Sequence, residues 1–173
     1  MSTILKWGLI TGMVYVAFSL IGNLLGIQQG GNYGLALLSN FLLLLATFFT
    51  IYLGVKETRD ESAKEYFTMG EGFVAGFKMV LIAAVIAVIF SFIYLQFIDP
   101  DFMEKILEQS EEQWDEMGVP EENREMGRKM QSYFTNPFVL SAIVLAQVLF
   151  WGAIKSLVAG IILKKNPPVV PMT

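Results

Sequence analysis

The sequence lacks two residue types that carry much of protein chemistry. Its 173 residues include no cysteine and no histidine. No disulfide, thiolate nucleophile or iron–sulfur cluster can form within the chain, and a zinc site or a histidine general base is excluded for the same reason. We therefore predict a protein that is not an enzyme and that has no metal and no cofactor.

Charge is also scarce. Charged residues make up 16% of the chain and hydrophobic residues 54%, with a mean hydropathy of +0.55. A soluble domain carries about 25% charged residues, so this chain is expected to lie in a membrane. The 12 basic residues are outnumbered by 16 acidic ones, which argues against nucleic acid as a partner because its binding depends on Lys and Arg.

The apolar residues form runs long enough to span a bilayer. No residue from Trp7 to Val55 is charged, and such a run exceeds the roughly 20 residues of one span. Clustered Gly and Asn at 28–34 mark a turn that divides it. The first span has no Ala-x-Ala cleavage site after it, so we expect it to be retained as an anchor.

The remaining spans have start and stop signals. Asp99-Pro100 ends the third span, because the residue before Pro is driven out of helical geometry. Asn136-Pro137 begins the fourth as an N-cap followed by a first-turn Pro. The prediction is one all-α membrane domain over residues 1–173, with four antiparallel transmembrane helices at 7–27, 35–55, 72–98 and 137–163 and a cytoplasmic loop at 56–71.

The basic residues predict the orientation. In the four-span arrangement 8 of the 12 fall on one side, namely Lys6, Lys56, Arg59, Lys64, Lys78, Lys155, Lys164 and Lys165. Loops rich in Lys and Arg stay in the cytoplasm. We therefore predict a multi-pass protein of a cytoplasmic (inner) membrane with both termini in the cytoplasm.

Residues 100–135 are predicted to form an extracytoplasmic amphipathic helical hairpin between the third and fourth spans. Gly118 is placed to end its first helix and Pro120 to begin its second. Apolar side chains recur at helical spacing, namely Met103, Leu107, Trp114, Met117, Met126 and Met130. Two interpretations are open. In the first, the apolar stripes pack on each other or on the membrane surface. In the second, a Met-rich face docks a partner protein, and this face is formed by Met103, Leu107, Trp114, Met126 and Met130.

Small residues recur at four-residue spacing in the spans. They are Gly8 and Gly12, Gly22 and Gly26, Gly72 and Gly76, and Gly152, Ser156 and Gly160. Small residues let helices approach closely in lipid. They predict packing within the four-helix unit or, alternatively, homodimerisation.

Two lysines, Lys78 and Lys155, fall inside predicted spans, in the cytoplasmic half. Either each long side chain reaches the interface separately, or the two form a shared site for a lipid phosphate or another anionic headgroup, with Glu71 as an internal counter-ion. Gln147, near the centre of the fourth span, is expected to bond a neighbouring helix. No Asp or Glu lies at mid-membrane, which argues against a proton-coupled transporter.

Several short motifs resemble an uncharacterised family of bacterial membrane proteins, catalogued as domain of unknown function 4199. The motifs are the run 93–102, Gly118 with Glu121, Glu122, Glu125 and Met126, the run 134–137, the run 152–158 leading to Lys164 and Lys165, and Phe67, Gly70, Phe73 and Gly76. Pro120 stands where that family's pattern has Ser, and it still begins a helix. The resemblance implies four spans in a bacterial inner membrane and brings no catalytic residues. It also suggests a partner in envelope assembly, such as a lipid-linked glycosyltransferase.

From these patterns we expect a non-catalytic accessory or scaffold subunit of an inner-membrane complex, in envelope or lipid-linked glycan assembly. Its partners would be the bilayer and another membrane protein, or a second copy of itself. The alternative is a small homo-oligomeric transporter or lipid-handling membrane protein.

Overall fold

The structure is a computed structural model that describes residues 1–27, 33–62, 64–134 and 136–165. Its elements are α1 (Thr3–Leu24), α2 (Tyr33–Glu61), α3 (Met69–Ile93), the π-helical turn η2 (Tyr94–Ile98), α4 (Phe102–Glu116), α5 (Glu121–Phe134) and α6 (Pro137–Leu163). In the described part of the chain, four helices are long and apolar enough to cross a membrane: α1, α2, α3 continued by η2, and α6. The all-α fold and the multi-pass membrane protein predicted from the sequence are confirmed to this extent.

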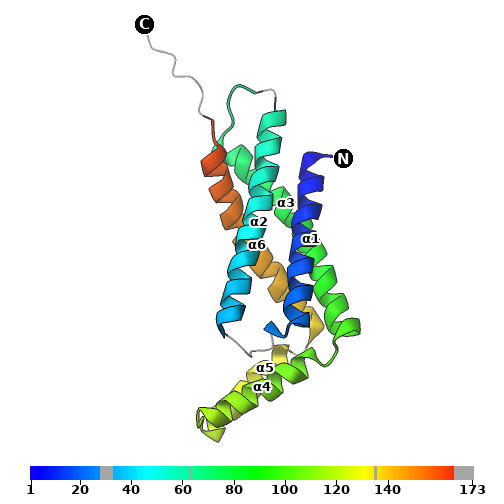
Figure 1. Cartoon of the computed structure of the whole chain (residues 1–173), viewed down its shortest axis with the longest axis vertical. Helices are drawn as coiled ribbons and strands as arrows, with labels where there is room; N and C mark the ends of the chain where they lie inside the picture. The colour runs from blue at the N-terminus through cyan, green and yellow to red at the C-terminus, as the bar shows by residue number, and fades with distance from the viewer. Residues whose placement is uncertain (28–32, 63, 135, 166–173) are drawn as a thin grey trace.

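Figure 1 shows the four long helices side by side, with α4 and α5 at the end of the bundle opposite to the start of α1 and the end of α6. We call these the hairpin end and the terminal end. Because α1 and α3 run toward the hairpin end and α2 and α6 run back, the predicted antiparallel order of the spans is found.

Three helices begin at capping residues that the local sequence supplies. The Ser2 hydroxyl accepts a hydrogen bond from the Leu5 N–H at the start of α1. Thr68 and Glu71 form a capping box at the start of α3. Asn136 caps α6 by accepting from the Phe138 N–H at 2.9 Å, with Pro137 in the first turn, as predicted.

The first two spans differ from their predicted limits. α1 begins at Thr3 and ends at Leu24, and Gly26 lies beyond it with a φ of 64°. This left-handed conformation suits glycine and ends the helix, so Gly26 does not pack in a span as predicted. The predicted turn at 28–34 lies largely outside the described residues.

α2 continues six residues past the predicted limit, through the charged segment 56–61. Charged residues with long side chains are good helix formers, so the helix projects beyond the apolar layer. The loop predicted at 56–71 is therefore shorter, because α2 ends at Glu61 and α3 begins at Met69. Within it, Phe67 is buried and exchanges two backbone hydrogen bonds with Lys165, of 3.0 and 2.7 Å.

α3 packs closely against both α1 and α6 through small residues. A Cβ at Gly72 would lie 2.7 Å from the Cα of Gly160, and one at Gly76 would lie 2.9 Å from the Ser156 hydroxyl oxygen. On the other side, Gly8 and Gly12 of α1 face isoleucines of α3, namely Ile82 and Ile86. Most of the predicted small-residue positions therefore pack one helix against another within the bundle. Packing within the four-helix unit was the first of the two roles predicted for them.

Candidate functional site

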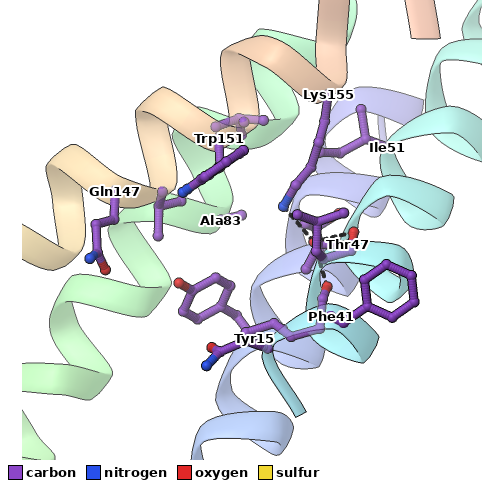
Figure 2. Close-up of a pocket in the computed structure, with 15 residues that line it drawn as sticks. Tyr15, Phe41, Thr47, Ile51, Ala83, Gln147, Trp151 and Lys155 are labelled. Carbon is purple, nitrogen blue, oxygen red and sulfur yellow. Dashed lines mark hydrogen bonds between the residues drawn. The ribbon is translucent and has the colours of Figure 1, made fainter. Parts of the chain in front are cut away.

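A pocket of about 330 Å³ lies inside the bundle between α1, α2, α3 and α6 (Figure 2). Most of its wall is apolar, and a few polar groups converge on it. Its lining comprises Thr11, Tyr15, Asn40, Phe41, Leu43, Leu44, Thr47, Ile51, Val80, Ala83, Gln147, Val148, Trp151, Gly152 and Lys155. We call it the Lys155 pocket. A small apolar pocket with convergent polar groups is the usual form of a ligand site.

Lys155 supplies the formal charge in this pocket. It lies eight residues before the end of α6 at Leu163, which places its Cα about 12 Å from the helix end. Figure 2 shows its side chain reaching from α6 to α2, where the ammonium nitrogen donates to the Thr47 hydroxyl at 2.6 Å. In the described part of the chain no carboxylate pairs with it. An ammonium has three donors, so two remain for a ligand.

Thr47 is held in place to receive this hydrogen bond. Its hydroxyl donates to the Leu43 carbonyl at 2.7 Å, so its oxygen lone pairs face the lysine. The Thr50 hydroxyl donates to the Thr47 carbonyl at 2.9 Å and lies 2.9 Å from the Thr11 hydroxyl. These three threonines are buried where α1 packs against α2.

The mouth of the pocket is on the outer surface of the bundle. Phe41 of α2 is 56% exposed and Trp151 of α6 is 48% exposed. Gln147 lies one turn before Trp151 on α6 and is exposed. It makes no hydrogen bond to another helix within the described residues, contrary to its predicted role. Both aromatic side chains belong to helices long and apolar enough to cross a membrane, and in a bilayer a mouth on this surface would open sideways.

A second, smaller pocket of about 160 Å³ lies toward the hairpin end. Its lining includes Tyr15, Ser19 and Asn23 of α1, with Ser91 of α3 and Tyr94 of η2. The Asn23 side-chain oxygen is buried there and has no hydrogen-bond partner among the described residues. We call this the Asn23 pocket. Tyr15 lines both pockets.

The other predicted lysine, Lys78, is not brought to Lys155. Gly76 of α3 faces α6, and Lys78 lies two residues further, about 200° around the helix. It is exposed on the side of α3 that carries the exposed Val74 and Leu81. It lines a different pocket, near the terminal end. The structure therefore does not support the predicted site shared by the two lysines.

Glu71, predicted as their counter-ion, has other partners. It forms an ion pair with Lys64, and it accepts a hydrogen bond from the Thr68 N–H at 2.9 Å in the capping box. The hydrogen bond from Lys64 to this carboxylate raises the pKa of the lysine. Glu71 is thus engaged in starting α3, although it lines the same outer pocket as Lys78.

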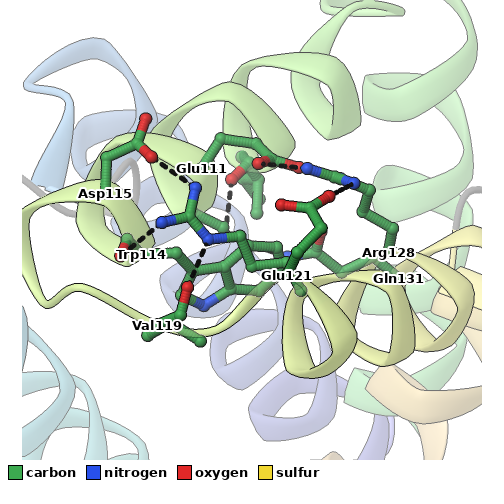
Figure 3. Close-up of polar contacts among 10 residues, drawn as sticks. Glu111, Trp114, Asp115, Val119, Glu121, Arg128 and Gln131 are labelled. Atoms are coloured by element: carbon green, nitrogen blue, oxygen red, sulfur yellow. Dashed lines mark hydrogen bonds and ion pairs between the residues drawn. The ribbon is translucent and has the colours of Figure 1, made fainter.

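α4 and α5 pack on each other by polar contacts around one aromatic side chain (Figure 3). Trp114 of α4 covers Gly127 of α5, where a Cβ would lie 2.5 Å from the ring. Arg128 forms ion pairs with Glu111 and Glu121, as Figure 3 shows, and Arg124 pairs with Asp115. The Arg128 guanidinium lowers the pKa of the Glu111 carboxyl. Gly118 ends α4 with a φ of 63°, as predicted for a C′ residue.

The predicted docking face divides into two parts. Met103, Leu107 and Trp114 are half-buried in α4, whereas Met126 and Met130 of α5 are exposed, as is Tyr133. Met126, Met130 and Tyr133 lie at helical spacing and make one exposed stripe on α5. We call it the α5 stripe.

Most of the polar residues in the two pockets were not predicted from the sequence. Thr11, Tyr15, Ser19 and Asn23 recur at every fourth position of α1, and Asn40 and Thr47 are seven apart on α2. This spacing puts each set on one helix face. Polar residues on one face of an apolar span were the signal that could have predicted the pockets.

Comparisons with known proteins identify the family. The family model described as "Protein of unknown function (DUF4199)" matches residues 6–165, which include nearly all of α1, the other three candidate spans and the α4–α5 pair. The chain belongs to this family. No curated protein and no solved structure matched it. Membership in DUF4199 brings no activity, so the function of this member must be inferred from its own pockets.

Proposed function

We propose that this DUF4199 protein is a lipid-handling membrane protein that binds an anionic amphiphile in the Lys155 pocket. The observation that carries the proposal is the ammonium group of Lys155, which faces an intramembrane pocket without a carboxylate partner among the described residues. This is the second of the two functions expected from the sequence.

The charge of Lys155 favours an anionic ligand. A lone cation in a low-dielectric site loses hydration that one neutral hydroxyl does not replace. A phosphate or carboxylate oxygen would restore it with charge-assisted hydrogen bonds, which are among the stronger ones in proteins. Thr47 already holds the ammonium toward the pocket, so little ordering is needed on binding.

The surroundings favour a lipid rather than a water-soluble anion. The mouth lies between the exposed rings of Phe41 and Trp151 on the apolar outside of the bundle. A ligand entering there comes from the bilayer. The volume of about 330 Å³ suits a headgroup and its first carbons better than a whole phospholipid, whose chains would stay in the surrounding lipid.

Binding can be measured through Trp151 at the mouth. In a Trp7→Phe/Trp114→Phe background, Trp151 becomes the remaining tryptophan. Phosphatidylglycerol with brominated chains should quench its fluorescence in neutral detergent at lower concentration than brominated phosphatidylcholine. Lys155→Met should weaken phosphatidylglycerol binding by about 10- to 100-fold, since hydrogen bonds to charged groups contribute about 1.5–3 kcal/mol.

Lys78→Met is the matched control, because it removes the same charge from a span without touching the Lys155 pocket. It should bind phosphatidylglycerol like the parent protein. Displacement of the lipid by inorganic phosphate alone would show that a soluble anion is the ligand. Equal quenching by both lipids in the parent protein would refute the proposal.

We further propose that the protein lies in a bacterial inner membrane with the terminal end in the cytoplasm. The support is the excess of Lys and Arg at that end. Cysteines introduced at Ser62 and Glu112 of this cysteine-free chain should react differently with an impermeant thiol reagent on intact cells. Glu112→Cys, on the exposed side of α4, should be labelled and Ser62→Cys only after lysis. The reverse pattern would invert the orientation.

The α5 stripe supports a second candidate, an accessory subunit that binds another membrane protein. Exposed methionines adapt to irregular partner surfaces, and Met126 and Met130 are 64% and 60% exposed. Purification in mild detergent distinguishes the two functions. Stoichiometric recovery of one membrane protein, lost on replacing both methionines by Glu, would favour the subunit.

A further inference from the structure

A line of polar side chains runs along α1 through both pockets. Thr11, Tyr15, Ser19 and Asn23 stand at every fourth position, and we call them the α1 polar stripe. Thr11 and Tyr15 line the Lys155 pocket, while Tyr15, Ser19 and Asn23 line the Asn23 pocket. The two pockets therefore follow one another along the same helix, with Tyr15 as their common wall.

The stripe is long compared with the membrane. Asn23 lies twelve positions after Thr11, which is about 18 Å along a helix. The hydrocarbon core is about 30 Å thick. On the terminal side the threonine contacts carry the polar line on to Lys155, because Thr11 meets Thr50 and Thr50 bonds to Thr47. On the other side, Asn23 is next to the last residue of α1.

The Asn23 pocket has acceptor capacity that the protein does not use. The Asn23 carboxamide oxygen is buried without a hydrogen-bond partner among the described residues, and buried polar groups normally have one. It can accept from a hydroxyl or an ammonium of a headgroup. The opposite wall is formed where α3 widens into the π-helical turn η2, with Tyr94 facing the pocket. Such turns are frequent at functional sites.

We infer that the two pockets form one route by which the headgroup of an anionic lipid crosses the bilayer. This inference rests on the proposed function, because the route begins at Lys155. The headgroup would pass from Lys155 along the α1 polar stripe to Asn23, while its acyl chains stay in the lipid outside. Polar groups that face the interior of a bundle lower the cost of bringing a headgroup into the membrane. Tyr15 must turn aside for each passage.

The movement needs no energy source. Among the described residues no Asp or Glu lines either pocket, so the route offers no carboxylate that could couple transport to protons. The protein would equilibrate a lipid between the two leaflets in both directions.

Vesicles containing the purified full-length protein test this inference. They are made of phosphatidylcholine with a trace of phosphatidylglycerol that carries a nitrobenzoxadiazole label on an acyl chain, and dithionite is added outside. In protein-free vesicles only the outer-leaflet label is bleached. With the protein, a second phase should bleach the inner-leaflet label as it reaches the outer surface.

The route can be blocked without changing the Lys155 pocket. Ser19→Leu with Asn23→Leu fills the Asn23 pocket with apolar side chains and should slow the second phase by about tenfold or more, since each lost hydrogen-bonding group raises the barrier to headgroup passage. Ala17→Leu instead adds one leucine on the exposed side of α1. This control should leave the rate unchanged.

The Trp151 quenching assay separates failure of the route from failure of the binding site. The blocked variant should still bind brominated phosphatidylglycerol. If the parent protein binds this lipid but gives no second phase, or if the blocked variant moves lipid at the parental rate, the route is refuted and the binding site stands. Release of an encapsulated dye with the second phase would also refute it, because dithionite would have entered. If the parent protein does not bind the lipid, the proposed function itself is wrong.

Discussion

Gly160→Leu should leave little folded protein in detergent, because at this position the backbones of α3 and α6 are in contact. A Cβ at Gly160 would lie 2.6 Å from the Met69 carbonyl oxygen and 3.0 Å from the Phe73 nitrogen. Backbone atoms cannot rotate away as a side chain can, so the two helices would have to separate. We expect destabilisation by more than about 3 kcal/mol, beyond the usual range for overpacking.

Gly70→Leu is the matched control, since it introduces the same side chain at the start of α3. There a Cβ would have the Thr68 hydroxyl oxygen at 3.9 Å as its nearest neighbour. Thermal unfolding followed by size-exclusion chromatography should show a parental profile for this control and aggregation for Gly160→Leu. Equal stability of the two variants would mean that α3 and α6 do not approach as closely as described.

This close contact also matters for the pockets. Gly152, Ser156 and Gly160 hold α6 against α3, and Lys155 lies on a neighbouring face of the same turns of α6. Since Ser156 and Lys155 are about 100° apart around the helix, packing of Ser156 against Gly76 directs Lys155 sideways, toward α2. The small-residue pattern thus fixes the direction of the candidate ligand-binding group.

The sequence predicted the spans well because each depends on local information. Runs of apolar residues, Asn136-Pro137 and Asp99-Pro100 act within a few residues of where they stand. Their predicted effects are found, apart from the longer α2 and the earlier end of α1. The small residues were recognised for the same reason, although the sequence could not choose their partner helices.

The candidate site was harder to predict because it depends on which face of each helix points into the bundle. Lys78 and Lys155 have similar depth, which suggested a common site. Depth follows from counting residues, but the direction of a side chain depends on which face packs inward. Gly76 packs on α6, so Lys78 points outward, and no property of Lys78 itself indicates this. Likewise, the sequence around Glu71 contained its capping box with Thr68, a local signal that was overlooked in favour of a distant lysine.

The α1 polar stripe shows the opposite situation, in which the pattern was present and its meaning depended on the fold. Ser and Thr are common in membrane spans and often bond to a carbonyl of their own helix, as the Thr11 hydroxyl does with the Trp7 carbonyl at 2.8 Å. The stripe is informative only once the neighbouring helices leave space beside it. That space is a tertiary property of α2, α3 and α6 together.

Lys155→Met should make the lipid-free protein more stable, even though it weakens lipid binding. Lys155 places a charge about 12 Å from the helix end against one neutral hydroxyl. Replacing even a paired buried ion by apolar side chains is often neutral or stabilising by about 1–4 kcal/mol, and replacing the half-buried Lys155, which lacks a counter-ion, should act in the same direction. Thr47→Val should act in the opposite direction, because it removes the oxygen that the ammonium contacts, at a cost of about 1–3 kcal/mol.

The double variant tests whether these effects share one cause. Once Lys155 is Met, the Thr47→Val change should cost much less, since no ammonium is left to satisfy, and a double-mutant cycle measures the difference. Thermal unfolding in neutral, lipid-free detergent gives all four values. Added phosphatidylglycerol should then raise the unfolding temperature of the parent protein and not that of Lys155→Met, because only a ligand that binds the folded state stabilises it. A large loss of stability in Lys155→Met without lipid would show that the lysine stabilises the fold. It would then have no need of an anionic ligand, and its position in the pocket would no longer indicate function.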